Sequence, residues 1–299
     1  MPEPMNRPAV TVVVPTYNRA PSLARLLDGL ADCDVPPGGI ELIVVDDGST
    51  DGTADVVRRS KVGARYVRQA NRGPAAARNA GWRLARGPLV AFTDDDTVPD
   101  RRWLVDLVDE LHARPELAAL GGAIRPLRRG LLADFVQLER LVDHGVDDGG
   151  GVRYLVTANA AWRADALRAV GGFDERFPVA AGEDVDMSHR LVGRGGRLGV
   201  TSRAVVLHDH RTTVADLLRT YRRHGTSRQL LARRHVELAI APTVARVASR
   251  RHWAERYRRY REVGGARPGV TIVYLALRAA GSLSFALGLI AARVRGRAA

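Results

Sequence analysis

Three consecutive carboxylates, those of Asp94, Asp95 and Asp96, follow the apolar run "PLVAFT". Adjacent like charges repel, and the repulsion is stronger where the groups are partly buried, so we expect a positive partner beside them. Oxygen ligands on adjacent or alternate residues suit a hard divalent cation such as Mg²⁺ or Mn²⁺. Two or three protein ligands would leave room for a diphosphate on the same cation. The alternative is a solvated acidic loop, or the start of a helix at Asp100.

Two other apolar runs also end in polar residues. The β-branched run "VTVVVPTYN" (10–18) ends in a turn after Pro15, and "IELIVVDD" (40–47) ends in Asp46 and Asp47. Segments with helical spacing separate the runs. Continuously apolar strands that alternate with helices predict a parallel sheet covered on both faces. Ligands bind beyond the carboxyl ends of the strands in such sheets, so we expect the site at that edge.

The chain beyond residue 100 divides into a less regular part and a helical tail. We expect a helix and a strand over residues 101–130, irregular structure over 131–160, and a helix over 183–196 whose acidic start suits the helix dipole. Short strands should follow and end in a pair of histidines, His208 and His210. The pattern beyond residue 212 is mostly helical. This organisation predicts an α/β domain over residues 8–212 and a basic helical region over 213–299.

Charge is unevenly distributed along the 299 residues. Residues 1–186 carry 23 basic and 28 acidic side chains, a balance of −5, and residues 187–299 carry 23 and 5, a balance of +18, which sum to the net charge of +13. This asymmetry suggests different partners for the two parts. The single cysteine, Cys33, excludes an intrachain disulfide and fits a reducing compartment. The first residues, "MPEPMNRPAV", lack the apolar core of a signal peptide, so we do not expect export.

Two segments of the basic tail suggest a membrane surface as a partner. Residues 251–263 combine arginines with Trp253, Tyr257 and Tyr260, which share one helical face. Residues 269–292 are largely apolar, contain one charged residue, Arg278, and are long enough to span a bilayer. An arginine at mid-span is costly, so a helix in the membrane plane, with Arg278 facing anionic headgroups, fits better. The alternatives are a single span, or a helix packed on protein or on a dimer mate. Nucleic-acid binding is disfavoured, because no recognition motif is present.

Six motifs occur in an order that resembles family 2 glycosyltransferases of the GT-A fold. They are "PTYNR", "VVDDGSTDGT", "NRGPAAARNAG", "FTDDD", "GGFDE" and "GEDVDMSHR", and the match runs over residues 10–212. Each motif is weak by itself, and their shared order and spacing carry the resemblance. It implies a mostly parallel sheet flanked by helices, here with a C-terminal helical extension, and a nucleotide-activated sugar as the donor.

The resemblance also implies roles for residues on the donor side. Pro15, Thr16 and Tyr17, with Asn18, resemble the segment that lines the nucleoside pocket. Asp47, or else Asp46, would accept a hydrogen bond from the base, which favours uridine; the alternative is a capped turn before Gly48. Arg78 resembles a basic residue near the nucleotide, and a surface charge on a helix is its alternative. The donor-side residues are therefore Pro15, Thr16, Tyr17, Asn18, Asp46, Asp47, Arg78, Asp94 and Asp95.

Further roles follow for the acidic motifs and the histidines. Asp94 and Asp96 match a D-x-D pattern: Asp96 would bind the metal, Asp94 the metal, the ribose or the sugar, and the extra Asp95 leaves the register open. His208 would complete the metal shell, with His210 as a rival. Asp184 would be the catalytic base, with Glu183 second; the alternative is that both cap a helix. Asn159 and Trp162 resemble the segment on the acceptor and sugar side, although Trp162 suits a core position equally well.

The implied function is that of an inverting, Mn²⁺- or Mg²⁺-assisted glycosyltransferase. It would move a sugar from a nucleotide-diphosphate donor, with UDP-sugars favoured, to a hydroxyl group of a lipid-linked or cell-envelope glycan. We expect a cytoplasmic protein, peripheral on the inner face of the plasma membrane, and the sequence is compatible with an oligomer. The alternatives are a catalytically inactive nucleotide- or glycan-binding module, and a glycosyltransferase that acts on a small-molecule acceptor.

Overall fold

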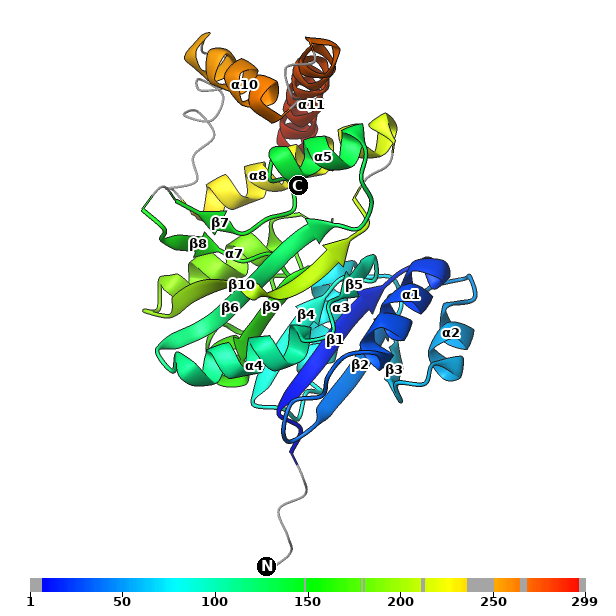
Figure 1. Cartoon of the computed structure of the whole chain (residues 1–299). Coiled ribbons are helices and arrows are strands. Elements are labelled where there is room, and N and C mark those ends of the chain that lie inside the picture. Colours follow the sequence, from blue (N-terminus) through cyan, green and yellow to red (C-terminus); the bar gives the residue numbers. More distant parts are fainter. Residues whose placement is uncertain are drawn as a thin grey trace, which may run out of the picture. The chain divides into compact units, whose positions relative to one another are not determined.

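The computed structural model describes residues 7–147, 149–177, 179, 181–210, 213–235, 250–263 and 268–295. The chain forms two compact units (Figure 1). The first contains Met1–Arg128 and Arg140–Asp209, and the second contains Arg129–Glu139 and His210–Ala299. The sequence analysis placed one boundary, after residue 212, whereas the second unit combines residues 129–139 with the segment that starts at His210. Residues 1–6 of the N-terminal segment "MPEPMNRPAV" lie outside the described residues, and so do residues 236–249 of the basic helical region.

An eight-stranded sheet forms the centre of the first unit. Its strand order is β3-β2-β1-β4-β9-β6-β10-β5. The strands are β1 (Val10–Thr16), β2 (Ile40–Asp46), β3 (Arg65–Arg68), β4 (Leu89–Thr93), β5 (Thr97–Pro99), β6 (Leu117–Pro126), β9 (Asn159–Arg163) and β10 (Arg197–His208). Strands β1 to β4 pair in parallel, as expected, and so do β6 and β10. The sheet is mixed because β9 runs antiparallel to β4 and β6, and β5 runs antiparallel to β10.

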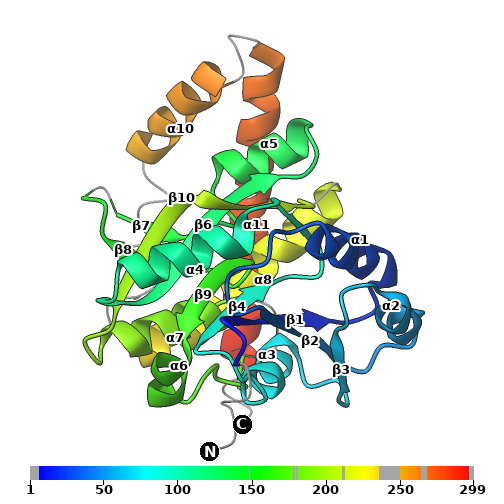
Figure 2. The same cartoon turned by 60° about the horizontal axis from the view of Figure 1, so that its bottom comes forward.

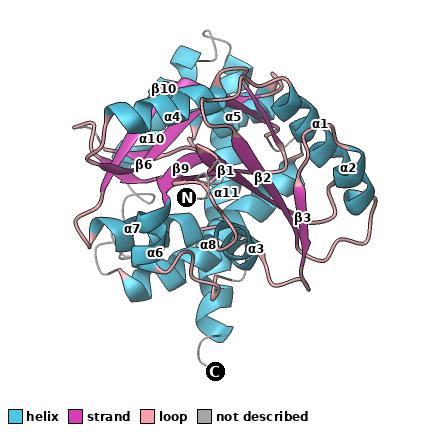
Figure 3. Cartoon of the chain, turned by 90° about the horizontal axis from the view of Figure 1, so that it is seen from below, coloured by secondary structure: helices cyan, strands magenta, loops and turns pink. Residues whose placement is uncertain are grey.

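Helices cover both faces of this sheet (Figures 2 and 3). On one face lie α1 (Ala20–Ala31), α2 (Thr53–Arg59) and α4 (Trp103–Ala113), and on the other lie α3 (Pro74–Trp82), α6 (Ala164–Val170) and α7 (Glu183–Val192). The alternation of strand side chains explains the two layers. Val12 and Val14 of β1 join the core under α1 and α4, whereas Val13 joins the core under α6 and α7. The expected α/β architecture is therefore confirmed.

Local structure differs from the sequence prediction at two places in this unit. The segment expected as short strands is one strand, β10, whose register with β6 shifts between Val200 and Val205. A small two-stranded sheet, β7 (Gly145–Val146) and β8 (Val152–Tyr154), lies in the segment predicted as irregular.

The second unit contains the helices α5 (Leu131–Leu138), α8 (Val214–Arg234), α10 (Arg250–Val263) and α11 (Pro268–Arg295). Glycines allow the backbones of α8 and α11 to touch. A Cβ atom on Gly225 would lie 2.0 Å from the carbonyl oxygen of Phe285, and one on Gly288 would lie 2.1 Å from that of Arg222. The Ser284 hydroxyl also donates a hydrogen bond of 2.7 Å to the Leu218 carbonyl. The apolar helix α11 is thus held against the arginine-containing helix α8.

A buried carboxylate, that of Glu139, joins α10 and α11 within this unit. It accepts hydrogen bonds from Arg256 and from the Tyr260 hydroxyl, the latter at 2.7 Å. Nε of Arg278 lies 3.1 Å from its second oxygen, and the Arg278 side chain is only 12% exposed. The expectation that Arg278 faces lipid headgroups is therefore wrong in this structure, because the side chain is largely buried and lies against Glu139. The expected common aromatic face of α10 is divided too, since Tyr260 is buried and Tyr257 is exposed.

Candidate active site

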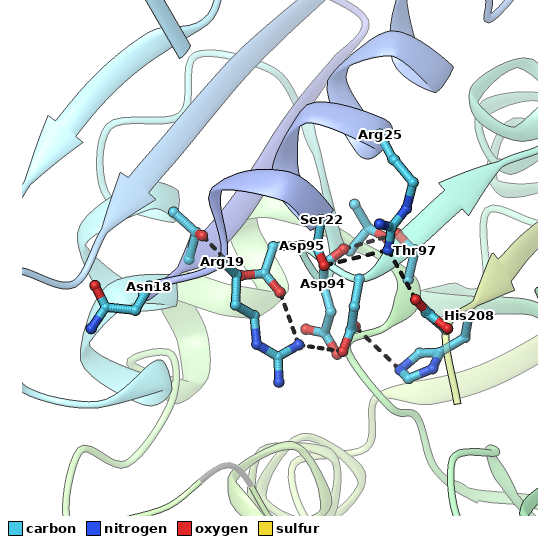
Figure 4. A network of polar contacts seen from close by, with 12 residues as sticks. Asn18, Arg19, Ser22, Arg25, Asp94, Asp95, Thr97 and His208 are labelled. Carbon is cyan, nitrogen blue, oxygen red and sulfur yellow. Dashed lines mark hydrogen bonds and ion pairs between the residues drawn. The ribbon is translucent and has the colours of Figure 1, made fainter. Parts of the chain in front are cut away.

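Asp94, Asp96 and His208 come together at the carboxyl ends of β4 and β10. Figure 4 shows Asp94 and His208 within the surrounding polar network. One ligand atom from each residue lies within 4.8 Å of those of the other two. Nε2 of His208 lies 3.4 Å from Oδ1 of Asp96. The chain brings them together because β5 turns back after the acidic motif and pairs Thr97 with His208. Two carboxylates and an imidazole form a donor set that can hold Mn²⁺ or Mg²⁺.

His210, the rival ligand in the sequence, lies elsewhere. It belongs to the second unit, where its Nε2 lies 3.1 Å from Oε1 of Gln137. Among the described residues, the candidate metal cluster contains His208 and not His210.

Asp95, the middle carboxylate, faces β1 instead of the candidate metal ligands. Its Oδ2 accepts a hydrogen bond of 2.8 Å from the Thr16 hydroxyl, and its Oδ1 lies 3.4 Å from Nη1 of Arg19. Burial raises the pKa of Asp95 to about 7, against the opposing effect of Arg19 and with a further contribution from the charge of Asp96. The carboxylate therefore connects the acidic motif to the "PTYNR" loop, while Asp94 and Asp96 are the two acids that group with His208.

Arg19 is a part of the site that sequence reasoning missed. It lies directly before α1, and its Nη1 lies 2.5 Å from Oδ2 of Asp96. The only signal was its place as the last letter of "PTYNR". A charged residue in a loop has no periodicity that would reveal its partner.

Arg78 links the two acidic motifs from inside the protein. Its Nη2 donates a hydrogen bond of 2.8 Å to Asp94, and its Nη1 donates one of 2.7 Å to Oε1 of Glu183. The side chain is buried, so the expected alternative of a surface charge is wrong. The guanidinium holds the end of β4 next to the first turn of α7, and the charges of Asp94 and Glu183 raise its pKa against the cost of burial.

Asp184 has the properties of a base that is active near neutral pH. Burial and, to a smaller extent, the charge of the adjacent Glu183 raise the pKa of its carboxyl group, against the effect of Arg78, to about 7. The backbone N–H of Val185 donates a hydrogen bond of 2.8 Å to Asp184. Glu183 differs, because it is paired with Arg78 through Oε1 and its Oε2 is buried without a hydrogen bond. This arrangement favours Asp184 over Glu183 as the proton acceptor.

The predicted nucleoside segment is tied to the loop after β2. The Asn18 side chain accepts a hydrogen bond of 2.8 Å from the Thr50 amide, and the Asn18 amide donates one of 2.8 Å to the Ser49 hydroxyl. Asn18 has a positive φ of 51°, which asparagine tolerates better than most residues. Pro15 and Thr16 are buried, whereas the Tyr17 ring is 47% exposed and is available for stacking.

The two acids after β2 face inward and organise loops. Asp46 accepts hydrogen bonds from the Ser49 amide at 2.7 Å and from the Tyr66 hydroxyl at 2.5 Å. Asp47 accepts from the Gln69 side chain at 2.6 Å and from the amides of Arg72 and Gly73, both at 2.8 Å. A base that approached Asp47 would have to share oxygens that already accept these bonds.

The residues predicted on the acceptor side lie in the core. Asn159 is fully buried; its Oδ1 accepts a hydrogen bond of 2.7 Å from Trp103, and its Nδ2 donates to the carbonyls of Ala123 and Ala204. Trp162 is also fully buried. Neither side chain has surface that an acceptor could contact, so the acceptor role expected from their motif is not supported for them.

Comparison with sequence families gives two matches. Residues 11–131 match the profile of "Glycosyl transferase family 2", and residues 89–292 match that of "Glycosyl transferase family group 2". A pre-mycofactocin glycosyltransferase of Mycobacterium tuberculosis is 36% identical over 258 residues, which cover 81% of this chain and 52% of that protein. A validoxylamine A glucosyltransferase of Streptomyces hygroscopicus subsp. limoneus is 34% identical over 220 residues, which cover 63% and 49%. The chain spans about half the length of these relatives.

Two solved structures share the fold of this chain. The mannosyltransferase PcManGT from Pyrobaculum calidifontis, in complex with GDP-Man and Mn²⁺, has a TM-score of 0.63 at 25% identity and covers 99% of this chain and 88% of its own. S. aureus TarS in complex with UDP has a TM-score of 0.55 at 20% identity, with coverages of 97% and 92%. These likenesses confirm the expected GT-A fold.

Proposed function

This chain belongs to glycosyl transferase family 2, and from that premise we propose that it transfers a sugar, with inversion, from a nucleotide-diphosphate donor to an acceptor hydroxyl group. One observation carries the proposal. Arg78 connects Asp94, in the candidate metal cluster, to Glu183, the neighbour of the candidate base Asp184. A leaving-group site and a proton acceptor are thereby fixed to each other, which transfer to a hydroxyl requires.

The donor set of Asp94, Asp96 and His208 would hold the divalent cation. When bound, Mn²⁺ or Mg²⁺ would neutralise the diphosphate that departs from the sugar. The complex of PcManGT with GDP-Man and Mn²⁺ supports this assignment. The protein's own contribution is to keep the two carboxylates after β4 and the imidazole at the end of β10. A diphosphate can approach them there from beyond the sheet edge.

Asp184 would accept the proton of the acceptor hydroxyl. A base must be ionised to act, and a pKa of about 7 keeps it both ionised and basic near neutral pH. Glu183 would position it, because its pairing with Arg78 fixes the first turn of α7. The raised pKa of Asp184 and the pairing of Glu183 with Arg78 also argue against the alternative of a catalytically inactive binding module.

The comparisons bear on the choice of nucleotide and on the choice of acceptor. We favour a UDP-sugar donor, which the UDP complex of TarS supports, while the GDP-Man complex of PcManGT makes guanosine the competing base. For the acceptor we favour a lipid-linked or cell-envelope glycan. The names of the relatives, a pre-mycofactocin glycosyltransferase and a validoxylamine A glucosyltransferase, favour a second candidate, namely a small-molecule acceptor.

We also propose that the protein is cytoplasmic and binds the inner membrane surface through α11. Residues 268–292 of this helix are long and apolar enough to cross a membrane, with a mean hydropathy of 1.7. One face of α11 packs on α8, as its contacts at Gly288 and Ser284 demonstrate. The opposite face is exposed and apolar; it consists of Ile272, Ala276, Ala279, Leu283, Leu287 and Ile290. A helix covered on one side by an arginine-containing helix suits the membrane plane better than a span, which would bring those arginines into lipid.

A screen of nucleotide sugars for released nucleotide tests the proposed activity. The wild-type protein with Mn²⁺ should release UDP or GDP from at least one donor, and Asp184→Asn should bind the same nucleotide but release far less. Binding without any release in the wild-type protein would favour the binding module.

A further inference from the structure

Arg19 contacts two carboxylates of the acidic motif, one of which, Asp96, is a candidate metal ligand. Its Nη1 lies 2.5 Å from Oδ2 of Asp96 and 3.4 Å from Oδ1 of Asp95 (Figure 4). The other oxygen of Asp96, Oδ1, is the one that lies 3.4 Å from His208. Arg19 and His208 therefore use different oxygens of one carboxylate, and Arg19 does not cover the oxygen that faces the candidate metal ligands.

The two arginines of this site differ in what they can offer an incoming ligand. Arg78 is buried and uses both terminal nitrogens, one for Asp94 and one for Glu183. The side chain of Arg19 is 37% exposed, and both of its contacts with the acidic motif use Nη1. A guanidinium carries five N–H donors in a planar fork. Arg19 thus has surface and donor groups beyond those that its carboxylate partners use.

An acidic motif needs cationic help to receive an anionic ligand. Asp94, Asp95 and Asp96 would repel a diphosphate, and Arg78 is already shared between two carboxylates. Guanidinium groups suit phosphate oxygens because they form paired, charge-assisted hydrogen bonds with them. Arg19 is a partly exposed side chain whose guanidinium lies directly beside two of these carboxylates.

We propose that Arg19 is a diphosphate-binding residue. Its guanidinium pairs with Asp95 and Asp96 in the nucleotide-free protein and donates hydrogen bonds to the phosphate oxygens when the nucleotide-sugar donor binds. This inference rests on the proposed function, because it assumes a nucleotide-diphosphate donor. It adds to the site a residue that belongs neither to the candidate metal ligands Asp94, Asp96 and His208 nor to the acidic pair Glu183 and Asp184.

Calorimetric titration in Mn²⁺ tests this role with UDP and GDP, and with uridine and guanosine as probes that lack phosphate. Arg19→Ala should weaken binding of the diphosphate by about ten- to a hundredfold, the value of one or two charge-assisted hydrogen bonds, and should leave nucleoside binding unchanged. Arg19→Lys should lose less of the affinity for the diphosphate, because lysine keeps the positive charge and lacks only the paired N–H donors of the guanidinium. Arg58→Ala is the matched control: it removes one positive charge from an exposed pair with Asp55 on α2 and should change neither affinity.

Binding of Mn²⁺ to the nucleotide-free protein gives a second readout. Removal of the positive charge beside Asp96 should strengthen Mn²⁺ binding in Arg19→Ala, whereas a residue that merely orients Asp96 would weaken it when lost. Three results for Arg19→Ala would overturn this inference but not the proposed function. They are an unchanged affinity for the diphosphate, an equal loss of affinity for the diphosphate and the nucleoside, and a weaker binding of Mn²⁺. Thermal unfolding checks that the variants are folded. If Arg19→Ala is not folded, Arg19→Lys is compared with the wild-type protein instead. Failure of the wild-type protein to bind either diphosphate would instead overturn the proposed function, and this inference with it.

Discussion

His208 ends β10 with its Nε2 3.4 Å from Oδ1 of Asp96, which follows β4. The short strand β5 creates this relationship, because it reverses the chain after the acidic motif and aligns Thr97 with His208. The backbone that carries the imidazole is therefore held in the sheet between β5 and β6 and not in a loop. A ligand held in this way is already oriented before a metal binds.

We expect His208→Ala to weaken Mn²⁺ binding by about tenfold or more, because one of the three grouped ligands is lost. Titration of the nucleotide-free protein with Mn²⁺ measures the affinity. His112→Ala is the control, since His112 is an exposed residue of α4 and should not affect binding. Equal Mn²⁺ affinities for the two variants would contradict the role of His208.

The pairing of Arg78 with Glu183 should be essential for stability. Arg78→Gln would leave the buried carboxylate of Glu183 without its partner, and we expect a loss of about 3–5 kcal/mol in the free energy of unfolding. Urea unfolding measures this loss. Arg83→Gln is the control, because Arg83 forms an exposed pair with Glu175 that should contribute less than about 1 kcal/mol. A loss no greater than that of the control would show that the buried pair is not needed.

The pH dependence of transfer should report the ionisation of Asp184. Its pKa is raised to about 7 by burial and by Glu183, against Arg78, and the charge of Asp94 also raises it. The ionised form is the base, so the rate should rise with pH, about tenfold per unit well below pH 7, and level off above that. Asp184→Asn should lower the rate by about 10²- to 10⁴-fold and remove this dependence. A profile of the same shape in the variant would assign the ionisation to another group.

The exposed face of α11 should determine membrane binding. Replacement of Leu283, Leu287 and Ile290 by Gln should weaken binding to anionic phospholipid vesicles by about a hundredfold or more, since each apolar side chain contributes about 1.5–3 kcal/mol when buried. Cosedimentation measures the bound fraction. Val35→Gln, which changes an exposed apolar residue of the first unit, should leave binding unchanged.

The orientation of α11 has a separate test. A helix in the membrane plane should be released by alkaline carbonate, whereas a spanning helix should remain with the lipid. Full resistance of the wild-type protein to carbonate extraction would contradict the in-plane arrangement.

The sequence predicts the features that depend on periodicity and on order along the chain. The apolar runs that end at Asp46 and Asp94 are strands, and their carboxyl ends meet at one edge because they are parallel neighbours of β1. The cluster of Asp94, Asp96 and His208 matches the set that the motif order implied. Strand polarity predicts that these residues lie at one edge of the sheet, and the pairing of β5 with β10 then brings His208 next to Asp96.

Contacts between side chains that are distant in sequence were not predictable in the same way. Asn159 looks like a ligand-binding residue within its motif, yet its amide satisfies Trp103 and two core carbonyls. Arg278 looks like a headgroup contact, yet it is largely buried against Glu139. In both cases a polar side chain finds a buried partner that only the folded chain brings near, and no local pattern records such a pair.

The most direct test of the proposed site is anomalous X-ray diffraction from crystals grown with Mn²⁺ and UDP or GDP. We expect an anomalous peak within coordination distance of Asp94, Asp96 and His208, with the diphosphate on the same ion and Asp184 on the sugar side. Bound nucleotide with the Mn²⁺ peak elsewhere, or with these three side chains turned away from the ion, would contradict the site.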